Sequence, residues 1–252
     1  MDDKIFKYYQ DRLWLLTSES STDDVIREYA EWAENYDKSM QEPNYNTPRP
    51  FAKLFDATVS KLFPEIQKKN FKVLDVAAGT GLLGLELNKL GYENIDALDM
   101  SQEMLSQART KNVYKKLVCA AMTDQQITDI DRGEYDALTC SSAVCTSHVR
   151  PSAVEEMIKI VKPGGVVCFN ISFVEVNSYE DKLKELEDTG EWRLALKEKI
   201  PFVRDKLTEE SILYIYEREG KATDLQAASF LESTLTCDLA IFLRSYYFYL
   251  AN

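Results

Sequence analysis

The feature that most constrains the fold is a short apolar run that ends in a glycine-bearing turn and is followed at once by leucines with helical spacing. The run covers residues 71–76, the turn covers 77–81, and the leucines extend to Gly91. A short apolar run before such a turn predicts a buried strand. Gly91 suits the end of a helix, because glycine readily adopts the left-handed backbone found just beyond a helix.

The same alternation continues along the middle of the chain. We expect further strands at 94–99, 116–121, 135–140 and 165–172, with helices at 101–111 and 151–161. Repeated strand–helix units predict a parallel, doubly wound α/β sheet, which binds ligands at the carboxyl ends of its strands.

The pattern changes after Ser172. We expect a helix at 179–188 and two strands, 192–203 and 212–218, that form an antiparallel hairpin at the sheet edge. The stretch 223–250 lacks glycine and proline and has apolar residues at roughly helical spacing, which predicts one long helix or a bent pair. Its aromatic cluster at 246–249 is a candidate homodimer contact.

The net charge of −12 argues against several partners. Nucleic acid and anionic membranes both require an excess of lysine and arginine, so neither is expected. The N-terminus has no secretory apolar region, and charged residues interrupt the apolar stretch 230–250, so we expect a cytoplasmic protein with no membrane span. Five cysteines without a C-x-x-C pair imply neither a zinc site nor a disulfide framework.

The charge is unevenly distributed. Residues 1–46 contain 11 acidic and 5 basic residues, 47–173 contain 15 of each, and 174–220 contain 13 acidic and 8 basic. The surplus of acidic residues therefore lies on both sides of an electrically neutral middle segment. It would favour the binding of cationic or neutral small molecules, or it would simply solvate the helices that carry it.

Two aspartates stand where the predicted strands meet their turns. Asp75 precedes the glycine turn, and Asp99 ends the second strand, 18 residues beyond Gly81. Glycines followed by a distal acid are shared by dinucleotide and S-adenosylmethionine binders. The turn lacks the third glycine of G-x-G-x-x-G at the expected place, although Gly84 is close, and this weakens the nicotinamide alternative.

Several blocks together resemble the class I S-adenosylmethionine-dependent methyltransferases, in particular small-molecule enzymes of the methyltransferase-like, Williams-Beuren-region type. The resemblance covers roughly residues 25–220. It rests on Tyr29–Asp37 with Tyr45, Val73–Gly81, Leu98–Leu105 with Ala108, Tyr135–Leu138 and Val161–Gly165.

The resemblance implies one Rossmann-like domain over residues 1–252, with a seven-stranded, mostly parallel sheet. Residues 1–50 would form an N-terminal helical cap and 51–172 the cofactor-binding core. Residues 173–220 would supply an acceptor-side helix and the edge hairpin, and 221–252 a C-terminal helical extension.

The resemblance also implies a site for S-adenosylmethionine, with S-adenosylhomocysteine as product. Asp75 would orient the turn and the cofactor's ammonium, Asp99 would accept the ribose hydroxyls, and Tyr36 with Trp32 would close over the sulfonium, which aromatic faces attract. The remaining expected contacts are the backbone of Ala77, Gly79 and Gly81, the adenine neighbours Met100 and Met122, the methionine-end residues Cys140 and Ser141, and Met104, which fits a helix core equally well.

At two positions, the role of the residue in the site has more than one interpretation. The family often has an acid where this chain has Ala121, so Thr123 or Asp124 would have to read the adenine amino group. His148, the only histidine, is our candidate catalytic base, since its ordinary pKa allows proton transfer at neutral pH; the alternative is a surface or helix-start histidine.

The leading functional hypothesis is methyl transfer to an oxygen or nitrogen nucleophile of a small molecule. A non-catalytic cofactor-binding or partner subunit is the alternative, and a nicotinamide-dependent oxidoreductase is the third. No metal is expected.

Overall fold

Seven strands form one mixed sheet in the order β3-β2-β1-β4-β5-β7-β6 in the computed structural model, which describes residues 16–41, 46–204 and 207–220. The pairs among β1 to β5 are parallel, whereas β7 is antiparallel to both β5 and β6. This confirms the predicted doubly wound sheet with an antiparallel edge hairpin. The strands are β1 (Val73–Val76), β2 (Ile95–Asp99), β3 (Leu117–Cys119), β4 (Tyr135–Cys140), β5 (Val161–Ser172), β6 (Trp192–Arg204) and β7 (Leu207–Arg218).

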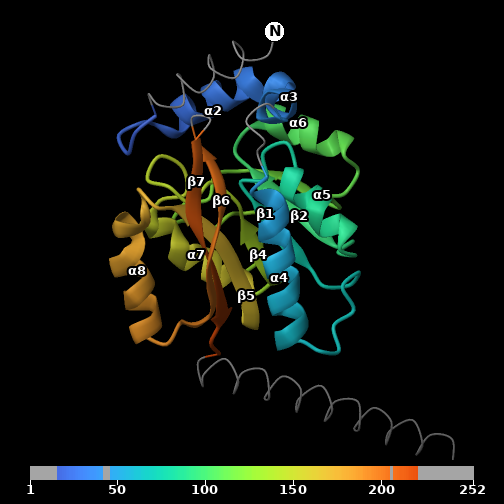
Figure 1. The fold of residues 1–252 in the computed structure, drawn as a ribbon, viewed down its shortest axis with the longest axis vertical. Helices are drawn as coiled ribbons and strands as arrows, with labels where there is room; N and C mark the ends of the chain where they lie inside the picture. The colour runs from blue at the N-terminus through green and yellow to red at the C-terminus, as the bar shows by residue number, and fades with distance from the viewer. Residues whose placement is uncertain (1–15, 42–45, 205–206, 221–252) are drawn as a thin grey trace, which may run out of the picture.

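Helices cover both faces of the sheet and one of its ends (Figure 1). Successive residues of a strand point to opposite faces, so each buried strand contributes to two cores. Val73 packs with α4 and α5 on one face, whereas Leu74 packs with α7 and α8 on the other. The helices are α2 (Thr22–Trp32), α3 (Tyr36–Gln41), α4 (Pro48–Leu62), α5 (Leu82–Lys89), α6 (Gln102–Thr110), α7 (Val154–Ile160) and α8 (Val176–Asp188), with 3-10 turns η1 (Ala33–Asn35) and η2 (Pro151–Ala153).

Strand β5 begins earlier than its sequence pattern predicts. Tyr135 pairs with Val161 but Ala137 pairs with Val166, so residues 162–165 form a bulge within the strand. Gly164 has φ +79°, and a Cβ on Gly165 would lie 2.5 Å from the Asp136 carbonyl oxygen. The bulge therefore requires both glycines. A bulge of this kind interrupts the alternation of apolar and polar residues, so that alternation does not predict it.

The N-terminal helices α2 and α3 lie across one end of the sheet, beside α6 (Figure 1). Helix α2 begins with a capping box, in which the Ser21 hydroxyl accepts from the Asp24 N–H and the Asp24 carboxylate accepts from the Ser21 N–H. Such a cap fixes where the helix starts. Helix α4, which the sequence analysis does not name, buries Phe51, Phe55 and Val59 against the sheet.

Some predictions fall outside the described residues. These are the helix over 223–250 and the homodimer contact through its aromatic cluster. Among the helices that the structure describes, none has the length and apolar character needed to cross a bilayer.

Candidate cofactor-binding site

The loop after β1 turns back on itself through three left-handed residues. Ala77, Gly79 and Gly81 have φ values of +51°, +55° and +88°. Glycine takes this conformation without steric cost, whereas Ala77 is strained by roughly 1–2 kcal/mol. The Gly81 N–H donates to the Ala78 carbonyl at 2.9 Å, and the Ala78 N–H donates to the Leu98 carbonyl at 3.1 Å. The loop is thereby held against the end of β2.

Asp99, the last residue of β2, holds this loop through its side chain. One carboxylate oxygen accepts from the Gly79 N–H at 2.8 Å and the other from the Ser101 N–H at 2.8 Å. Burial raises the pKa of Asp99, and these two donors act in the opposite direction. The glycine turn and Asp99 are therefore in direct contact, which the sequence does not predict.

Asp75 is buried within β1 and is held by two hydroxyl groups. The Tyr114 hydroxyl donates at 2.7 Å and the Thr139 hydroxyl at 3.1 Å. Burial raises the pKa of Asp75 to about 7, and the two hydrogen bonds only partly oppose this. The carboxyl group is therefore close to half ionised at neutral pH.

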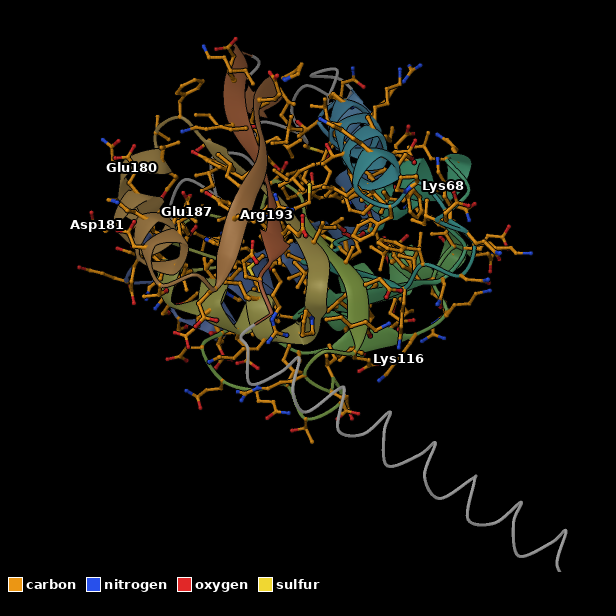
Figure 2. The ribbon with its side chains drawn as sticks, turned by 90° about the horizontal axis from the view of Figure 1, so that it is seen from below. Lys68, Lys116, Glu180, Asp181, Glu187 and Arg193 are labelled. Atoms are coloured by element: carbon orange, nitrogen blue, oxygen red, sulfur yellow. The ribbon has the colours of Figure 1, made fainter. Side chains whose placement is uncertain are left out.

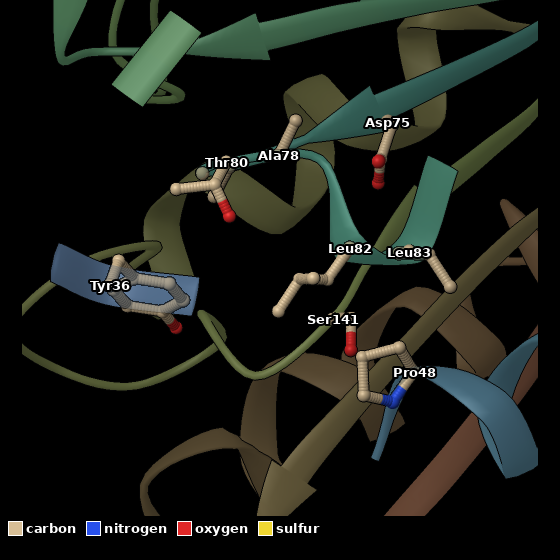
Figure 3. Close-up of a pocket in the computed structure, with 10 residues that line it drawn as sticks. Tyr36, Pro48, Asp75, Ala78, Thr80, Leu82, Leu83 and Ser141 are labelled. Atoms are coloured by element: carbon tan, nitrogen blue, oxygen red, sulfur yellow. The ribbon is translucent and has the colours of Figure 1, made fainter. Parts of the chain in front are cut away.

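A first cavity, of about 50 Å³, lies over the β1 loop (Figure 3). The Ser141 side chain, just beyond β4, points toward the ring of Pro48 in this cavity. Its hydroxyl oxygen is buried and has no hydrogen-bond partner among the described residues. An orphaned buried hydroxyl is costly unless a ligand satisfies it. The lining residues are Tyr36, Pro48, Asp75, Ala77, Ala78, Gly79, Thr80, Leu82, Leu83 and Ser141.

A second cavity, of about 290 Å³, lies beyond the end of β2. Asp99 connects the two cavities, because it bonds Gly79 in the first and precedes Met100 in the second. The second cavity also contains the two positions proposed to replace the missing adenine-reading acid. Its lining residues are Ser20, Thr22, Val25, Met100, Ala121, Met122, Thr123, Asp124, Ser147, His148, Arg150, Ser152 and Ala153.

Comparison with known proteins agrees with this geometry. Residues 73–165, which run from β1 into the bulge of β5, match the family model described as a methyltransferase domain. Over this stretch the chain carries a methyltransferase domain, and it is similar to the class I S-adenosylmethionine-dependent methyltransferases.

Two relatives and one solved structure illustrate the extent of this likeness. The methyltransferase is 29% identical over 171 residues to human methyltransferase-like protein 27, covering 65% of this chain and 66% of that protein. It is 33% identical over 101 residues to a ubiquinone biosynthesis O-methyltransferase of Alkalilimnicola ehrlichii, covering 39% and 40%. The chain thus spans less than two thirds of either relative.

The fold resembles that of magnesium protoporphyrin IX methyltransferase from Synechocystis, solved with bound S-adenosylmethionine. The TM-score is 0.50 at 12% identity, covering 86% of the methyltransferase and 97% of that chain.

The residues of the methyltransferase fit the cofactor that its family uses. A side chain added at Gly79 would meet no atom within 4 Å, so the loop faces open space. The orphaned Ser141 hydroxyl lies in the same cavity. Asp99 stands between the first cavity and the second, which is lined by Met100 and Met122, and its ribose-binding role stays a prediction.

Tyr36 and Trp32, the two aromatic residues expected to close over the cofactor, lie at different distances from the first cavity. Tyr36 lines the first cavity, whereas Trp32 is buried behind it, with ring centroids 4.6 Å apart. Asp37, the next residue, accepts from the Thr80 hydroxyl and from Lys111 Nζ, the latter at 2.6 Å. These contacts tie α3 to the β1 loop and to the end of α6.

His148 lines the second cavity of the methyltransferase, not the first. Its Nε2 lies 3.0 Å from the Tyr29 hydroxyl, and its Nδ1 lies 2.7 Å from Ser147 Oγ and 3.1 Å from Cys145 Sγ. Both ring nitrogens therefore have partners, one of which belongs to the cap. The catalytic-base assignment of His148 stays a prediction.

Five predicted cofactor residues line neither of these two cavities: Trp32 and Asp99, described above, and Gly81, Met104 and Cys140. Gly81 precedes the first turn of α5, Met104 is buried in α6, and Cys140 is buried in β4. Their cofactor contacts stay predictions. The sequence assigns no site role to Tyr114, nor to Asp37 and Tyr29 of the segment that carries the family resemblance, although all three reach the site from distant segments. The one sequence signal for Tyr114 is Gly84, whose missing side chain leaves room for its ring.

Replacing Gly84 with alanine should disturb the Asp75 carboxylate from outside the loop. The new Cβ would lie 2.3 Å from the Tyr114 hydroxyl oxygen and 2.4 Å from Cζ of its ring, so the ring must move. We expect a loss of about 1–3 kcal/mol in the free energy of unfolding, measured by urea denaturation. Gly84→Ala in a Tyr114→Ala background is the control, because the ring that the new Cβ would meet is then absent. Equal losses from Gly84→Ala in the two backgrounds would contradict the packing argument.

Cys145 and His148 should interact as an acid–base pair, in which His148 makes the Cys145 thiol more acidic than an ordinary cysteine. Burial raises the pKa of Cys145, but the adjacent His148 more than offsets it, and the pKa lies below the ordinary value. Burial lowers the pKa of His148, whereas Cys145 raises it further, to above its ordinary value. We expect His148→Ala to slow iodoacetamide alkylation of Cys145 at pH 7 by roughly five- to tenfold, followed by peptide mass spectrometry. The exposed Cys119 is the internal reference. An unchanged Cys145 rate would show that the pair does not exist.

Proposed function

We propose that this methyltransferase transfers the methyl group of S-adenosylmethionine to an oxygen or nitrogen nucleophile of a small-molecule acceptor. When bound, the cofactor supplies a methyl group on a cationic sulfur that is already activated toward displacement. The work of the chain's residues is then to align the acceptor and exclude water. Tyr36, Asp75, Asp99 and Ser141 would hold the cofactor, and the cap would close the site.

The observation that supports a small acceptor is the attachment of the cap over the carboxyl ends of the strands. Asp37 bonds Thr80 and Lys111, and Tyr29 contacts His148, so two points fix the cap over the site. A site covered by a fixed cap favours a small molecule over a nucleic-acid strand or a folded protein surface. The O-methyltransferase name of the bacterial relative supports oxygen as one nucleophile.

The acidic surplus does not select the charge of the acceptor. Glu180 and Asp181 lie on the outer side of α8, away from the core of the molecule (Figure 2). Within the same helix, Lys182 pairs with Glu185 and Lys184 with Asp188. These charges support the solvation alternative, so cationic, neutral and anionic acceptors all belong in a screen.

The test is transfer of a tritiated methyl group from S-adenosylmethionine to a panel of phenols, catechols, amines, carboxylates and thiols, with protein and nucleic acid as further acceptors. We expect labelling of a phenol, catechol or amine by the wild type and none by Asp99→Ala. Labelling of macromolecules alone would overturn the proposal. Cofactor binding with no turnover on any acceptor would favour the non-catalytic alternative.

The same assay tests His148. Loss of turnover in His148→Ala with S-adenosylhomocysteine binding retained would support the base assignment. Wild-type turnover would remove it.

A further inference from the structure

The loop after β4 has a strained residue next to the orphaned hydroxyl. Ser142 has φ +63°, in the left-handed region that serine rarely adopts. Its neighbour Ser141 carries the buried hydroxyl that faces the first cavity without a partner among the described residues (Figure 3). The direction of a side chain follows from the backbone conformation around it. The conformation at Ser142 therefore affects where the Ser141 hydroxyl points.

A buried side chain from the neighbouring strand holds this conformation. Asn170 of β5 is only 1% exposed, and its Oδ1 accepts from the Ser142 N–H at 2.8 Å. Its Nδ2 donates to the hydroxyl of Ser211 on β7 at 2.9 Å, and Ser211 is fully buried. The two ends of the amide thus make separate contacts, and only the Oδ1 end contacts the loop after β4. Strained backbone conformations persist when surrounding contacts of this kind determine them.

We propose that Asn170 is a positioning residue of the methyltransferase: it holds Ser142 in the left-handed conformation and so keeps the Ser141 hydroxyl aimed into the cofactor cavity. This inference rests on the proposed function, because it takes the first cavity as the place where the amino-acid end of the cofactor binds. Asn170 itself lines neither of the two cavities. It acts through the backbone of residues 141 and 142.

The test measures the dissociation constant of S-adenosylhomocysteine by isothermal titration, at a temperature where circular dichroism shows each variant to be folded. Asn170→Leu is close in size but cannot accept from the Ser142 N–H. We expect it to weaken binding about tenfold, since the loop can leave the left-handed conformation. Ser211→Ala is the matched control, because it removes the other hydrogen bond of the same amide. We expect its dissociation constant to stay within about threefold of wild type.

A rescue variant separates positioning from a merely structural role. Glycine adopts the left-handed conformation without steric cost, so Ser142→Gly depends less on Asn170. We therefore expect the double variant Ser142→Gly/Asn170→Leu to bind about threefold or more tightly than Asn170→Leu alone. If Asn170→Leu does not fold, Asn170→Ser, which is too short to reach Ser142, replaces it in both variants.

Two results would overturn the proposal. One is wild-type affinity in the folded Asn170 variant, and the other is a weakened Asn170 variant that Ser142→Gly does not improve. Both differ from a failure of the proposed function, which would show either as no S-adenosylhomocysteine binding by the wild type or as binding without turnover of a small-molecule acceptor.

Discussion

Replacing Asp99 with alanine is expected to weaken S-adenosylhomocysteine binding by at least about 100-fold. The carboxylate is the predicted acceptor for two ribose hydroxyls, and hydrogen bonds to a charged group contribute roughly 1.5–3 kcal/mol each. A loss of about 3 kcal/mol corresponds to more than 100-fold in the dissociation constant. The variant also releases the Gly79 N–H that Asp99 binds in the structure, so the loop loses its anchor as well.

A second buried aspartate of the same strand provides the control. Asp96 accepts from the Tyr135 hydroxyl at 2.9 Å and lies near Lys72, at 3.7 Å from its Nζ. It lies near the start of β2, three residues before Asp99, whose carboxylate bonds the β1 loop. Asp96→Asn should therefore lower the free energy of unfolding but leave the dissociation constant within about threefold of wild type. Equal affinities of Asp99→Ala and wild type would reject the ribose assignment.

Stability of the cofactor-free protein should fall as pH rises, because of Asp75. Its pKa is raised from the ordinary value of 3.8 to about 7, mainly by burial. The folded state therefore binds more protons than the unfolded state between these values. The contribution of Asp75 to the free energy of unfolding is therefore fully present below pH 3.8 and is lost as pH rises through about 7. Between pH 5 and pH 8 the loss from this group is roughly 2–3 kcal/mol.

Asp75→Asn isolates this contribution from other titrating groups. The amide has almost the same shape and can still accept from the Tyr114 hydroxyl, but it does not titrate. Urea denaturation at pH 5 and pH 8 should show wild type losing roughly 2–3 kcal/mol more than the variant. Wild type should also bind S-adenosylhomocysteine more tightly at the higher pH, since an ionised Asp75 suits the cofactor's ammonium. Parallel pH profiles for the two proteins would mean that Asp75 has an ordinary pKa when folded.

Local sequence patterns account for the part of the site that is built by neighbouring residues. Asp75, Gly79 and Asp99 are predictable because a strand, its turn and the end of the next strand recur with fixed geometry in parallel sheets. The parallel arrangement of the strands follows from the same repeats, whereas their order does not. The edge hairpin is visible from its β-forming residues, although its register is not.

Contacts between distant segments account for the part that the sequence does not reveal. Tyr114 reaches Asp75 across 39 residues, Asp37 reaches Thr80 across 43, and Tyr29 reaches His148 across 119. No periodicity in one sequence encodes such pairs, because they arise only when helices pack on the finished sheet. The bulge at 162–165 was missed for a related reason, since it depends on the backbone of β4 lying against Gly165.

The most direct test of the account is isothermal titration of the wild-type chain with S-adenosylhomocysteine and, separately, with NAD. A class I methyltransferase with Asp99 at its ribose site predicts saturable, one-to-one binding of S-adenosylhomocysteine and no binding of NAD. Binding of NAD with none of S-adenosylhomocysteine would contradict the account.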